Sequence, residues 1–386
     1  MINILYAYER DMPTISIMRK DAELFFGKDA SVRYLNVSKI RSNDIDWADR
    51  VVFIRPDNVL SYLLAKKAHK TGCYVVAFCD DDLLHLPKSI PSMPWRRRYL
   101  RKIIREADMF QSSSNRICQD YAKAFDKQKC YASDTPIYDD DIAKIPAKRV
   151  KNDKTIKLVY AAGKDHAGIF NDFIKPIIPR LIERYGDSVS LMTVGVDPDL
   201  KEFLGGPMRI EHRKGMPLDE YRQFMRDQSF DIGLAPLHDD EFNRRKYFNK
   251  YIEYTLVGTV GIFSNCEPYT FAVEDEVNGF LANNTENDWY QTICKAIEHS
   301  DLRDKCLNTA INQLKTRFSA QALIQRFKEE NPDFLKKKDK KSNCGSLQWI
   351  KTRYAFSRLA DIAYLVWFYF RKDGITGLLN KAREHL

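Results

Sequence analysis

Several motifs that would place this chain in a common enzyme class are missing from its sequence. It has no phosphate-binding loop G-x-x-x-x-G-K-[ST], no dinucleotide fingerprint G-x-G-x-x-G, no nucleophile motif G-x-S-x-G and no zinc motif H-E-x-x-H. These absences weaken the case for P-loop enzymes, dinucleotide-dependent dehydrogenases, serine hydrolases and zinc proteases. Gly and Pro are few, 16 and 15, and follow no period, which excludes a collagen-like or proline-rich architecture.

Disulfide and zinc frameworks are missing as well. The eight cysteines are scattered, with no C-x-x-C pair and no His/Cys cluster at zinc spacing. Most stand in apolar contexts, as Cys79 does after Val75-Val76-Ala77-Phe78. We therefore expect small buried thiols in a reducing compartment.

Long apolar runs are also lacking. No run reaches the roughly 18 residues of a transmembrane helix. The first residues, Met1-Ile2-Asn3-Ile4-Leu5-Tyr6, lack the basic and apolar regions of a signal peptide. The sequence therefore predicts a cytoplasmic protein.

Net charge is scarce except near the C-terminus. The chain carries +9, and residues 336–386, with twelve Lys/Arg and four Asp/Glu, carry +8 of it. The remaining residues are therefore almost neutral, whereas a nucleic-acid enzyme usually spreads basic charge over its working face. We predict no nucleic-acid partner and expect an anionic membrane surface to bind residues 336–386.

The length of 386 residues suits two domains of ordinary size. The N-terminal third alternates short apolar runs with helical patterns, which predicts a parallel sheet covered on both faces. The predicted strands are Ile2–Ala7, Arg50–Ile54, Cys73–Cys79 and Met109–Ser112, and the predicted helices are Val59–Thr71 and Trp95–Ala107.

A polar stretch around 140–155 indicates a linker between domains. A second series of alternating strands and helices follows it. Its predicted strands are Ile156–Ala161, Val189–Val194, Met208–Glu211, Phe230–Ala235, Gly261–Ser264 and Gly279–Leu281, with helices at Phe170–Tyr185, Tyr247–Leu256 and 286–328. We predict an α/β protein of two doubly wound, Rossmann-like domains, 1–145 and 146–330, that face a cleft. A basic, aromatic, helical tail, 331–386, follows them. Ligands of such sheets bind at the carboxyl ends of the strands.

The densest polar cluster contains Lys246, Lys250 and Glu253. On a helix over 246–257 these three side chains lie within about 60° of one another. Two lysines and a glutamate suit a nucleotide sugar, because lysines neutralise a diphosphate and a carboxylate accepts bonds from ribose hydroxyls. The alternative is a solvated charged stripe on a surface helix, which is common.

The sequence around this cluster resembles the donor-binding half of GT-B glycosyltransferases, specifically the bacterial group-1 retaining enzymes of surface polysaccharide synthesis. The match is specific over about 156–300 and architectural only over 1–150. It rests on Tyr160-Ala161-Ala162-Gly163-Lys164-Asp165-His166, Val194-Gly195, Asp231-Ile232-Gly233-Leu234-Ala235-Pro236-Leu237, Phe242-Asn243, Lys246, Lys250, Glu253-Tyr254, Gly258 and Pro268-Tyr269.

The resemblance implies that the second domain holds a nucleotide-sugar donor and the first domain holds the acceptor, with no essential metal. Glu253 would bind the ribose, and Lys246 and Lys250 would line the pocket near the phosphates. The loop 267–270 would touch the sugar or diphosphate. The full set of donor-binding candidates is Gly163, Lys164, Asn243, Lys250, Glu253, Pro268 and Tyr269, and the catalytic candidates are Lys246, His166 and Asp81.

Two of these candidates also have an interpretation without a functional role. His166 could contact the sugar or a phosphate, but a lone histidine after a strand is more often a satisfied loop residue. Lys164 could pair with the leaving diphosphate, or it could be a solvated loop lysine.

One position departs from the family. Many members carry a second glutamate eight positions before the one that matches Glu253, and this chain has Arg245 there. Either another residue, such as Asp239, Glu241 or Asn243, serves the sugar, or the enzyme recognises the sugar differently.

The run Asp80-Asp81-Asp82 follows a predicted buried strand. It superficially matches the D-x-D metal site of the GT-A glycosyltransferases, and three carboxylates could bind Mg²⁺ or Mn²⁺. A helix N-cap and first turn is the plainer interpretation. The functional alternative is that Asp81 orients an acceptor hydroxyl from the first domain.

Two segments combine cations with aromatic rings. The first spans Trp95–Arg105, where the alternative to contact with lipid phosphates is a solvated helix face. The second holds the apolar run Leu359–Phe370, about 18 Å long as a helix and too short to cross a bilayer. It suits the membrane interface, or it is a final helix docked on the protein body.

We therefore expect a retaining glycosyltransferase, peripheral on the inner face of the cell membrane, with a lipid-linked or surface-glycan acceptor. A nucleotide-sugar 2-epimerase of related fold is one alternative. A non-catalytic scaffold that binds nucleotide sugars is another.

Overall fold

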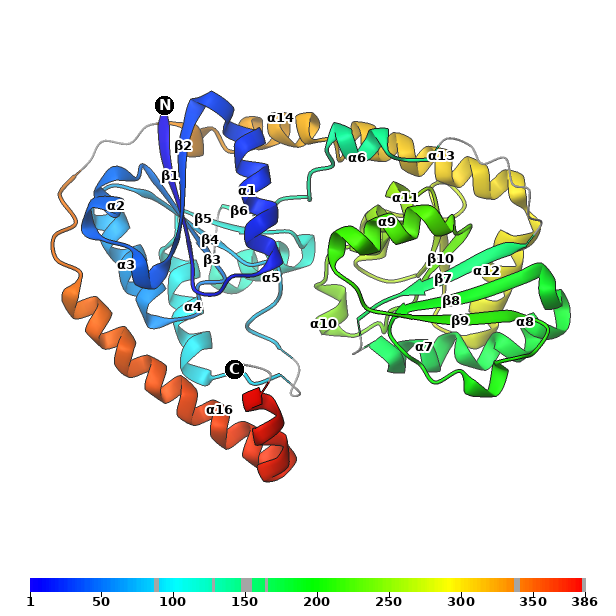
Figure 1. The fold of residues 1–386 in the computed structure, drawn as a ribbon. Coiled ribbons are helices and arrows are strands. Elements are labelled where there is room, and N and C mark those ends of the chain that lie inside the picture. The colour runs from blue at the N-terminus through cyan, green and yellow to red at the C-terminus, as the bar shows by residue number, and fades with distance from the viewer. Residues whose placement is uncertain (87–89, 127–128, 147–154, 164–165, 337–340, 384–386) are drawn as a thin grey trace. The chain divides into compact units, whose positions relative to one another are not determined.

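The chain folds, in a computed structural model, into two compact α/β units (Figure 1). The structure describes residues 1–86, 90–126, 129–146, 155–163, 166–336 and 341–383. The first unit comprises Met1–Asp134 and Ile324–Leu386, and the second comprises Thr135–Leu323.

The first unit is built on a six-stranded parallel sheet of order β2-β1-β3-β4-β5-β6. Its strands are β1 (Ile2–Tyr8), β2 (Ala30–Asn36), β3 (Arg50–Ile54), β4 (Tyr74–Phe78), β5 (Met109–Ser112) and β6 (Cys130–Ala132). Its helices are α1 (Pro13–Phe26), α2 (Ser42–Trp47), α3 (Val59–Lys70), α4 (Pro94–Glu106), α5 (Asn115–Phe125), most of α14 (Ala320–Glu330), α15 (Pro332–Leu335) and α16 (Gln348–Arg383).

Alternate residues of the strands pack on opposite faces of this sheet, as the two-residue period of a strand requires. On β1, Leu5 and Ala7 face a core that also contains residues of α3, α4 and α5. Ile4 and Tyr6 face a second core together with residues of α1, α14 and α15. Both faces of the sheet are thus covered.

The C-terminal segment packs with the first unit rather than standing apart from it. The buried guanidinium of Arg50 donates to the backbone oxygens of Asp333 and Phe334. Leu347 and Ile350 are buried in the core formed with α3. The residues from Ile324 onward therefore belong to the first unit, because apolar side chains such as Leu347 and Ile350 are buried in its core.

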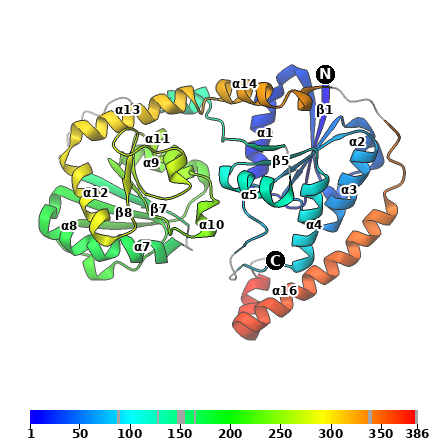
Figure 2. The same cartoon turned by 180° about the vertical axis from the view of Figure 1, so that it is seen from behind.

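Helix α16 runs along the first unit, and both views show it passing α3 and approaching α4 (Figures 1 and 2). Gly374, at φ 66°, interrupts its helical backbone. The helix begins eleven residues before the predicted apolar run at Leu359, because the inner face of its first turns is buried on the protein.

The second unit has a six-stranded parallel sheet of order β12-β11-β10-β7-β8-β9. Its strands are β7 (Ile156–Ala161), β8 (Val189–Gly195), β9 (Arg209–Lys214), β10 (Ile232–Ala235), β11 (Val260–Ser264) and β12 (Phe280–Ala282). Its helices are α6 (Asp139–Ala143), α7 (Ala167–Phe173), α8 (Ile178–Tyr185), α9 (Leu218–Gln228), α10 (Glu241–Arg244), α11 (Asn249–Leu256), α12 (Glu286–Glu298) and α13 (Ser300–Thr316).

Helices cover both faces of this sheet too. Figures 1 and 2 show α9, α11 and α13 on one face and α7, α8 and α12 on the other. The prediction of an α/β protein with two doubly wound domains is confirmed. As expected, seven of the eight cysteines are buried; Cys130 is half-buried, and none of the eight forms a disulfide.

The structure also differs locally from the predicted elements. The helix expected over Phe170–Tyr185 is broken by a 3-10 turn at Lys175–Ile177, where Pro176 and Pro179 cannot supply backbone donors. The two edge strands of the first sheet, β2 and β6, were not predicted, because β2 has half-exposed residues without a continuous apolar run and β6 has only three residues.

Candidate functional site

The predicted donor-side residues lie where the strands of the second sheet end. Strand β7 is central, and the chain first adds β8 and β9 on one side and then β10 on the other. The carboxyl ends of β7 and β10 therefore flank the topological switch point, where ligands of such sheets bind. Gly163 and His166 follow β7, the α10–α11 segment follows β10, and Pro268 and Tyr269 follow β11.

Lys250 and Glu253 form a close ion pair on α11. The Lys250 Nζ lies 2.5 Å from Glu253 Oε2, and the Tyr221 hydroxyl of α9 donates to the same oxygen at 3.4 Å. Burial opposes the charge of Lys250, but the Glu253 carboxylate outweighs it and the lysine pKa is raised. Glu253 keeps 34% of its side chain exposed. Its carboxylate is thus held in place and still accessible to hydroxyl groups.

Tyr221 was missed by sequence reasoning. Its ring lies 5.5 Å from Lys250 Nζ, so it contacts both members of the pair. Burial and the neighbouring carboxylate raise the pKa of its hydroxyl well above the usual value. Residue 221 lies 32 positions before Glu253, and no sequence spacing links the two.

Helix α11 is anchored at the switch point by Tyr254. The buried Tyr254 hydroxyl donates to the Leu234 carbonyl of β10 at 2.9 Å and accepts from the Ala161 amide of β7 at 3.4 Å. A Cβ at Gly233 would lie 2.4 Å from the Tyr254 ring. The glycine is therefore needed for the close approach of α11 to β10, which sets the position of Glu253.

Lys246 does not share the helical stripe with Lys250 and Glu253. Helix α11 begins at Asn249, and Lys246 lies in the bend between α10 and α11. Its Nζ is 5.3 Å from the Phe242 ring centroid. The predicted helix over 246–257 therefore starts three residues too early, and only two of the three residues share a helix face.

Arg245, where the sequence departs from the family, lies in a segment that is held by ion pairs between its own side chains. Asp239 makes two bonds with Arg244, at 2.6 and 2.8 Å. Arg245 contacts the Glu241 carboxylate at 3.3 Å, one helical turn away. Each of these two candidate sugar ligands is thus engaged by an arginine of its own segment.

Asn243 is buried inside this loop. The Asp240 side chain caps α10 by accepting from the Asn243 amide at 2.8 Å, and the Asn243 side chain donates to the same carboxylate at 2.7 Å. The contacts of Asn243 shape the segment that follows β10.

The described residues that follow β7 make close contacts. The His166 amide donates to the Gly163 carbonyl at 3.0 Å, and the His166 carbonyl accepts from the Tyr160 hydroxyl at 3.0 Å. Gly195 at the end of β8, with φ 83°, lies so close that a Cβ would be 2.5 Å from the Ala162 oxygen. The predicted residue Lys164 lies outside the described residues.

Pro268 and Tyr269 are both buried beside β11. The Tyr269 ring packs on Phe263 with centroids 4.8 Å apart. Burial, aided by the Glu253 carboxylate, raises the pKa of the Tyr269 hydroxyl. Both residues thus lie at the end of β11, on the side where the sequence predicts the donor site.

A hydrogen-bonded network that the sequence did not indicate fixes the loop after β10. The Ser264 hydroxyl accepts from the Leu237 amide at 2.8 Å and donates to the Asn284 side chain at 2.7 Å. Asn284 in turn donates to the Leu237 carbonyl at 2.8 Å. The ends of β10, β11 and β12 are thereby joined at one edge.

On the first sheet, Asp80 and Asp81 share one arginine. Arg55, directly after β3, contacts Asp80 at 2.5 Å and Asp81 at 2.6 Å. Thr14 of α1 donates to the other Asp80 oxygen at 2.6 Å. Burial would raise the pKa of Asp80, but the bond with Arg55 lowers it overall. Asp81 is 44% exposed, so it is the more accessible of the two carboxylates.

The Asp82 side chain bonds groups other than the arginine that binds Asp80 and Asp81. It accepts from the Tyr121 hydroxyl at 2.7 Å and from the backbone of the turn that follows it, so its role is structural. Among the residues that the structure describes, no group of three His, Cys, Asp or Glu side chains is placed to hold a metal ion. The three consecutive carboxylates therefore do not converge.

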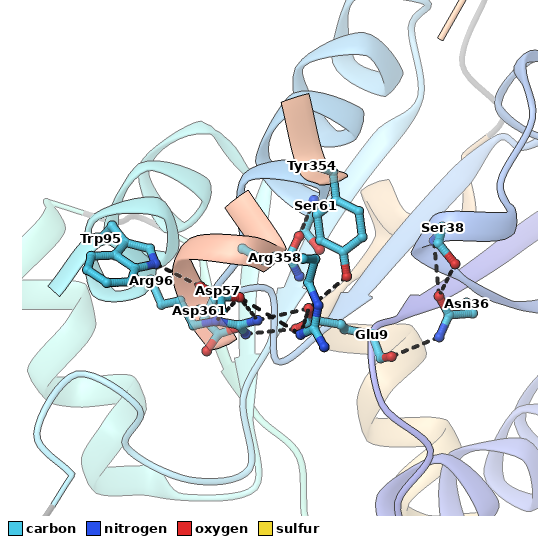
Figure 3. Close-up of polar contacts among 11 residues, drawn as sticks. Glu9, Asn36, Ser38, Asp57, Ser61, Trp95, Arg96, Tyr354, Arg358 and Asp361 are labelled. Atoms are coloured by element: carbon cyan, nitrogen blue, oxygen red, sulfur yellow. Dashed lines mark hydrogen bonds and ion pairs between the residues drawn. The ribbon is translucent and has the colours of Figure 1, made fainter. Parts of the chain in front are cut away.

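A buried charge network, which sequence reasoning missed, lies beside this edge (Figure 3). Arg96 of α4 bonds both oxygens of Glu9, which directly follows β1, at 2.8 and 2.9 Å. It also bonds Asp57 and Asp361, each at 2.7 Å. Arg96 belongs to the basic stretch that we expected to be solvated or to contact lipid phosphates, but this arginine is buried among three carboxylates.

The sequence matches no protein-family model and no curated protein. Solved structures do match over most of the chain. HepE from Anabaena in complex with UDP has a TM-score of 0.61 and 14% identity, over 86% of this chain and 100% of its own. WaaB, a lipopolysaccharide outer core galactosyltransferase in apo form, has a TM-score of 0.60 and 14% identity, over 86% and 99%.

A third match is a putative UDP-N-acetylglucosamine 2-epimerase from Listeria monocytogenes. Its TM-score is 0.54 and its identity 11%, over 86% of this chain and 96% of its own. HepE was also solved with UDP-glucose, at a TM-score of 0.59. These likenesses show that the chain has the GT-B fold, as the sequence resemblance implied.

The described helices include none that combines the length and the apolar character needed to cross a membrane.

Proposed function

We propose that this protein is a glycosyltransferase whose second unit binds a nucleotide-sugar donor. The observation that carries the proposal is the position of Glu253, accessible and held by Lys250 beside the switch point between β7 and β10. A fixed carboxylate there can accept hydrogen bonds from both ribose hydroxyls. The HepE structures with UDP and UDP-glucose make a uridine nucleotide sugar the first donor to test.

In the proposed reaction the bond between the anomeric carbon and the donor phosphate breaks, and the nucleoside diphosphate leaves with the electron pair. The acceptor oxygen bonds to the anomeric carbon, and its proton passes to the leaving diphosphate. Lys246 and His166 are the proposed catalytic groups of the second unit, stabilising the charge that develops on the diphosphate. Retention of configuration is part of the proposal, and it needs no protein carboxylate pair of the kind that hydrolases use.

The first unit is the proposed acceptor side. Asp81 is accessible and oriented by Arg55, so it can accept a hydrogen bond from the reacting hydroxyl. We propose a lipid-linked or surface-glycan acceptor, met on the cytoplasmic face of the membrane. The net charge of +8 in residues 336–386 and the similarity to WaaB, a lipopolysaccharide outer core galactosyltransferase, support this choice.

The proposal is tested by thermal unfolding of the purified chain with UDP-, GDP-, CMP- and dTDP-sugars, with and without Mg²⁺. A donor that binds only the folded protein raises the midpoint by mass action. We expect a rise with one nucleotide family and no requirement for Mg²⁺. No rise with any donor would contradict the donor site, and a rise only with Mg²⁺ would contradict metal-independent binding.

The Listeria structure favours a second candidate, a nucleotide-sugar 2-epimerase. An epimerase changes the donor sugar without any acceptor. Incubation with the donor that binds, followed by chromatography of the sugar, separates the two functions. Conversion in the absence of acceptor would favour the epimerase, whereas an unchanged donor with a new product only in the presence of acceptor supports transfer.

A further inference from the structure

Helix α16 has two faces of different character. Ile350, Tyr354 and Asp361 recur at the spacing of one helix face, and all three contact the first unit. The opposite face carries large apolar side chains whose exposed fractions lie between 46% and 69%, namely Trp349, Phe356, Leu359, Ile362, Val366, Trp367 and Phe370.

The inner face is fixed in orientation by polar contacts. Asp361 is buried and bonds Arg96 at 2.7 Å and the Trp95 indole at 2.8 Å. The Tyr354 hydroxyl donates to Glu9 at 2.8 Å, as Figure 3 shows. The helix cannot rotate to bury its outer face without breaking these buried bonds, which would be costly.

Between Gln348 and Lys372 the outer face combines apolar and cationic side chains, and the exposed acid Asp373 follows directly after this stretch. Asp361 is the only acidic residue between Gln348 and Lys372, and it is turned inward. Arg353, Arg371 and Lys372 are exposed along the same helix. Exposed indole rings lie next to two of these cations, with Arg353 over Trp349 and Arg371 over Trp367.

We infer that this outer face of α16 is a docking surface for a lipid bilayer that contains anionic lipids. Aromatic and aliphatic side chains bordered by cations are the composition of helices that lie in the membrane interface. The cations complement anionic headgroups, and the apolar side chains enter the boundary of the acyl chains. The helix lies on the bilayer and does not cross it, because its inner face is packed on the first unit.

The inferred surface also connects the membrane with the proposed acceptor side. The inner face of α16 touches Glu9 at the end of β1, and a helix is only about 10 Å thick. A bilayer on the outer face would therefore lie about one helix diameter from the carboxyl edge of the first sheet. This last link rests on the proposed function, whereas the docking surface itself does not.

The test measures cosedimentation of the full chain with vesicles of phosphatidylcholine and phosphatidylglycerol. The variant Phe356→Glu/Trp367→Glu places two charges on the outer face. The control Ile17→Glu/Leu204→Glu places the same charges on exposed apolar residues of α1 and of the second unit. We expect at least tenfold weaker binding for the outer-face variant and unchanged binding for the control. Equal binding by the two variants would overturn the inference.

Tryptophan quenching by brominated phosphatidylcholine in the same vesicles reports insertion. Trp349 and Trp367 are exposed, whereas Trp289 is fully buried in the second unit. We expect quenching of the wild-type chain and its loss in Trp349→Phe/Trp367→Phe. Binding without quenching would mean that the cations of residues 336–386 alone bind the vesicle, and it would overturn the role of the apolar face.

Two further measurements test whether the outer face binds a second copy of the chain and whether the donor site is intact. If sedimentation velocity shows a dimer that the outer-face variant abolishes, while vesicle binding persists, the face binds a second copy and the inference is wrong. Donor-induced thermal shifts should be the same in the outer-face variant and in the wild type. A failed vesicle experiment with a normal donor shift therefore leaves the proposed function intact. Deletion of 336–386 is unsuitable, because it removes Leu347 and Ile350 from the core of the first unit.

Discussion

Asp361 of α16 lies 2.7 Å from Arg96 of α4, although 265 residues separate them in the sequence. Both side chains are buried, and Arg96 also bonds Glu9 at the end of β1. The contact fixes the last long helix to the carboxyl edge of the first sheet. It also turns Asp361, the only acidic residue between Gln348 and Lys372, away from the exposed face.

Replacing Asp361 with alanine should destabilise the first unit. The change removes a carboxylate from the buried Arg96 and from the Trp95 indole, and breaking a buried pair costs about 3 kcal/mol. Urea unfolding followed by tryptophan fluorescence measures this loss. Asp373→Ala, on the exposed end of the same helix, is the matched control and should leave the midpoint unchanged. Equal midpoints for the two variants would contradict the structural role of Asp361.

Glu9 should make stability depend on pH at the acid end. Burial opposes ionisation of its carboxyl group, but the hydrogen bond with Arg96 outweighs it, and the pKa of Glu9 is lowered in the folded protein. Its stabilising effect is therefore complete above about pH 4.3, the value for an unfolded glutamate, and is lost as pH falls through the folded pKa. Glu9→Gln should lower the unfolding temperature at pH 7 and differ less from the wild type near pH 3.

Asp57 belongs to the same network, but its pKa is shifted in the opposite direction to that of Glu9. Burial raises the pKa of Asp57 in spite of Arg96, so its ionised form opposes folding at neutral pH. We expect Asp57→Asn to leave the unfolding temperature at pH 7 unchanged or to raise it, whereas Glu9→Gln lowers it. Equal losses in the two variants at pH 7 would contradict this assignment of the charges.

Glu253→Ala should weaken binding of the nucleoside part of the donor. Loss of a charged acceptor for two hydroxyls costs about 1.4 kcal/mol or more, which is about tenfold in affinity. Calorimetric titration with the free nucleoside diphosphate measures the effect. Glu286→Ala, at the exposed start of α12, is the control and should bind normally. Unchanged affinity in Glu253→Ala would remove the residue from the ribose site.

Asp81→Asn should lower turnover and leave the donor affinity unchanged. The carboxylate is held by Arg55 on the unit that we propose binds the acceptor, so its loss affects the acceptor hydroxyl only. We expect at least a tenfold fall in kcat, because the reacting hydroxyl loses the group that orients it. Asp82→Asn is unsuitable as a control, because Asp82 is buried and bonds Tyr121. A parallel loss of donor affinity in Asp81→Asn would contradict an acceptor-side role.

Much of the fold could be predicted because buried parallel strands are continuous apolar runs. Strands β3, β5 and β7 have the predicted bounds, and the ends of β4 differ by one residue. The edge strand β2 escaped prediction because half-exposed residues carry no such signal. On the donor side, the helical spacing of Lys250 and Glu253 was readable, whereas the start of α11 after Lys246 depends on how the α10–α11 segment folds back on the sheet.

The sequence by itself determined the α/β class, the presence of two doubly wound sheets, and the concentration of positive charge and aromatic rings near the C-terminus. These properties follow from local periodicity and composition. Only the tertiary structure decided that Tyr221 joins Lys250 and Glu253, that Arg55 joins Asp80 and Asp81, and that Arg96 is enclosed by Glu9, Asp57 and Asp361. Such contacts unite residues from distant strand ends and helices, so they arise from the order of strands in each sheet and leave no trace in sequence spacing.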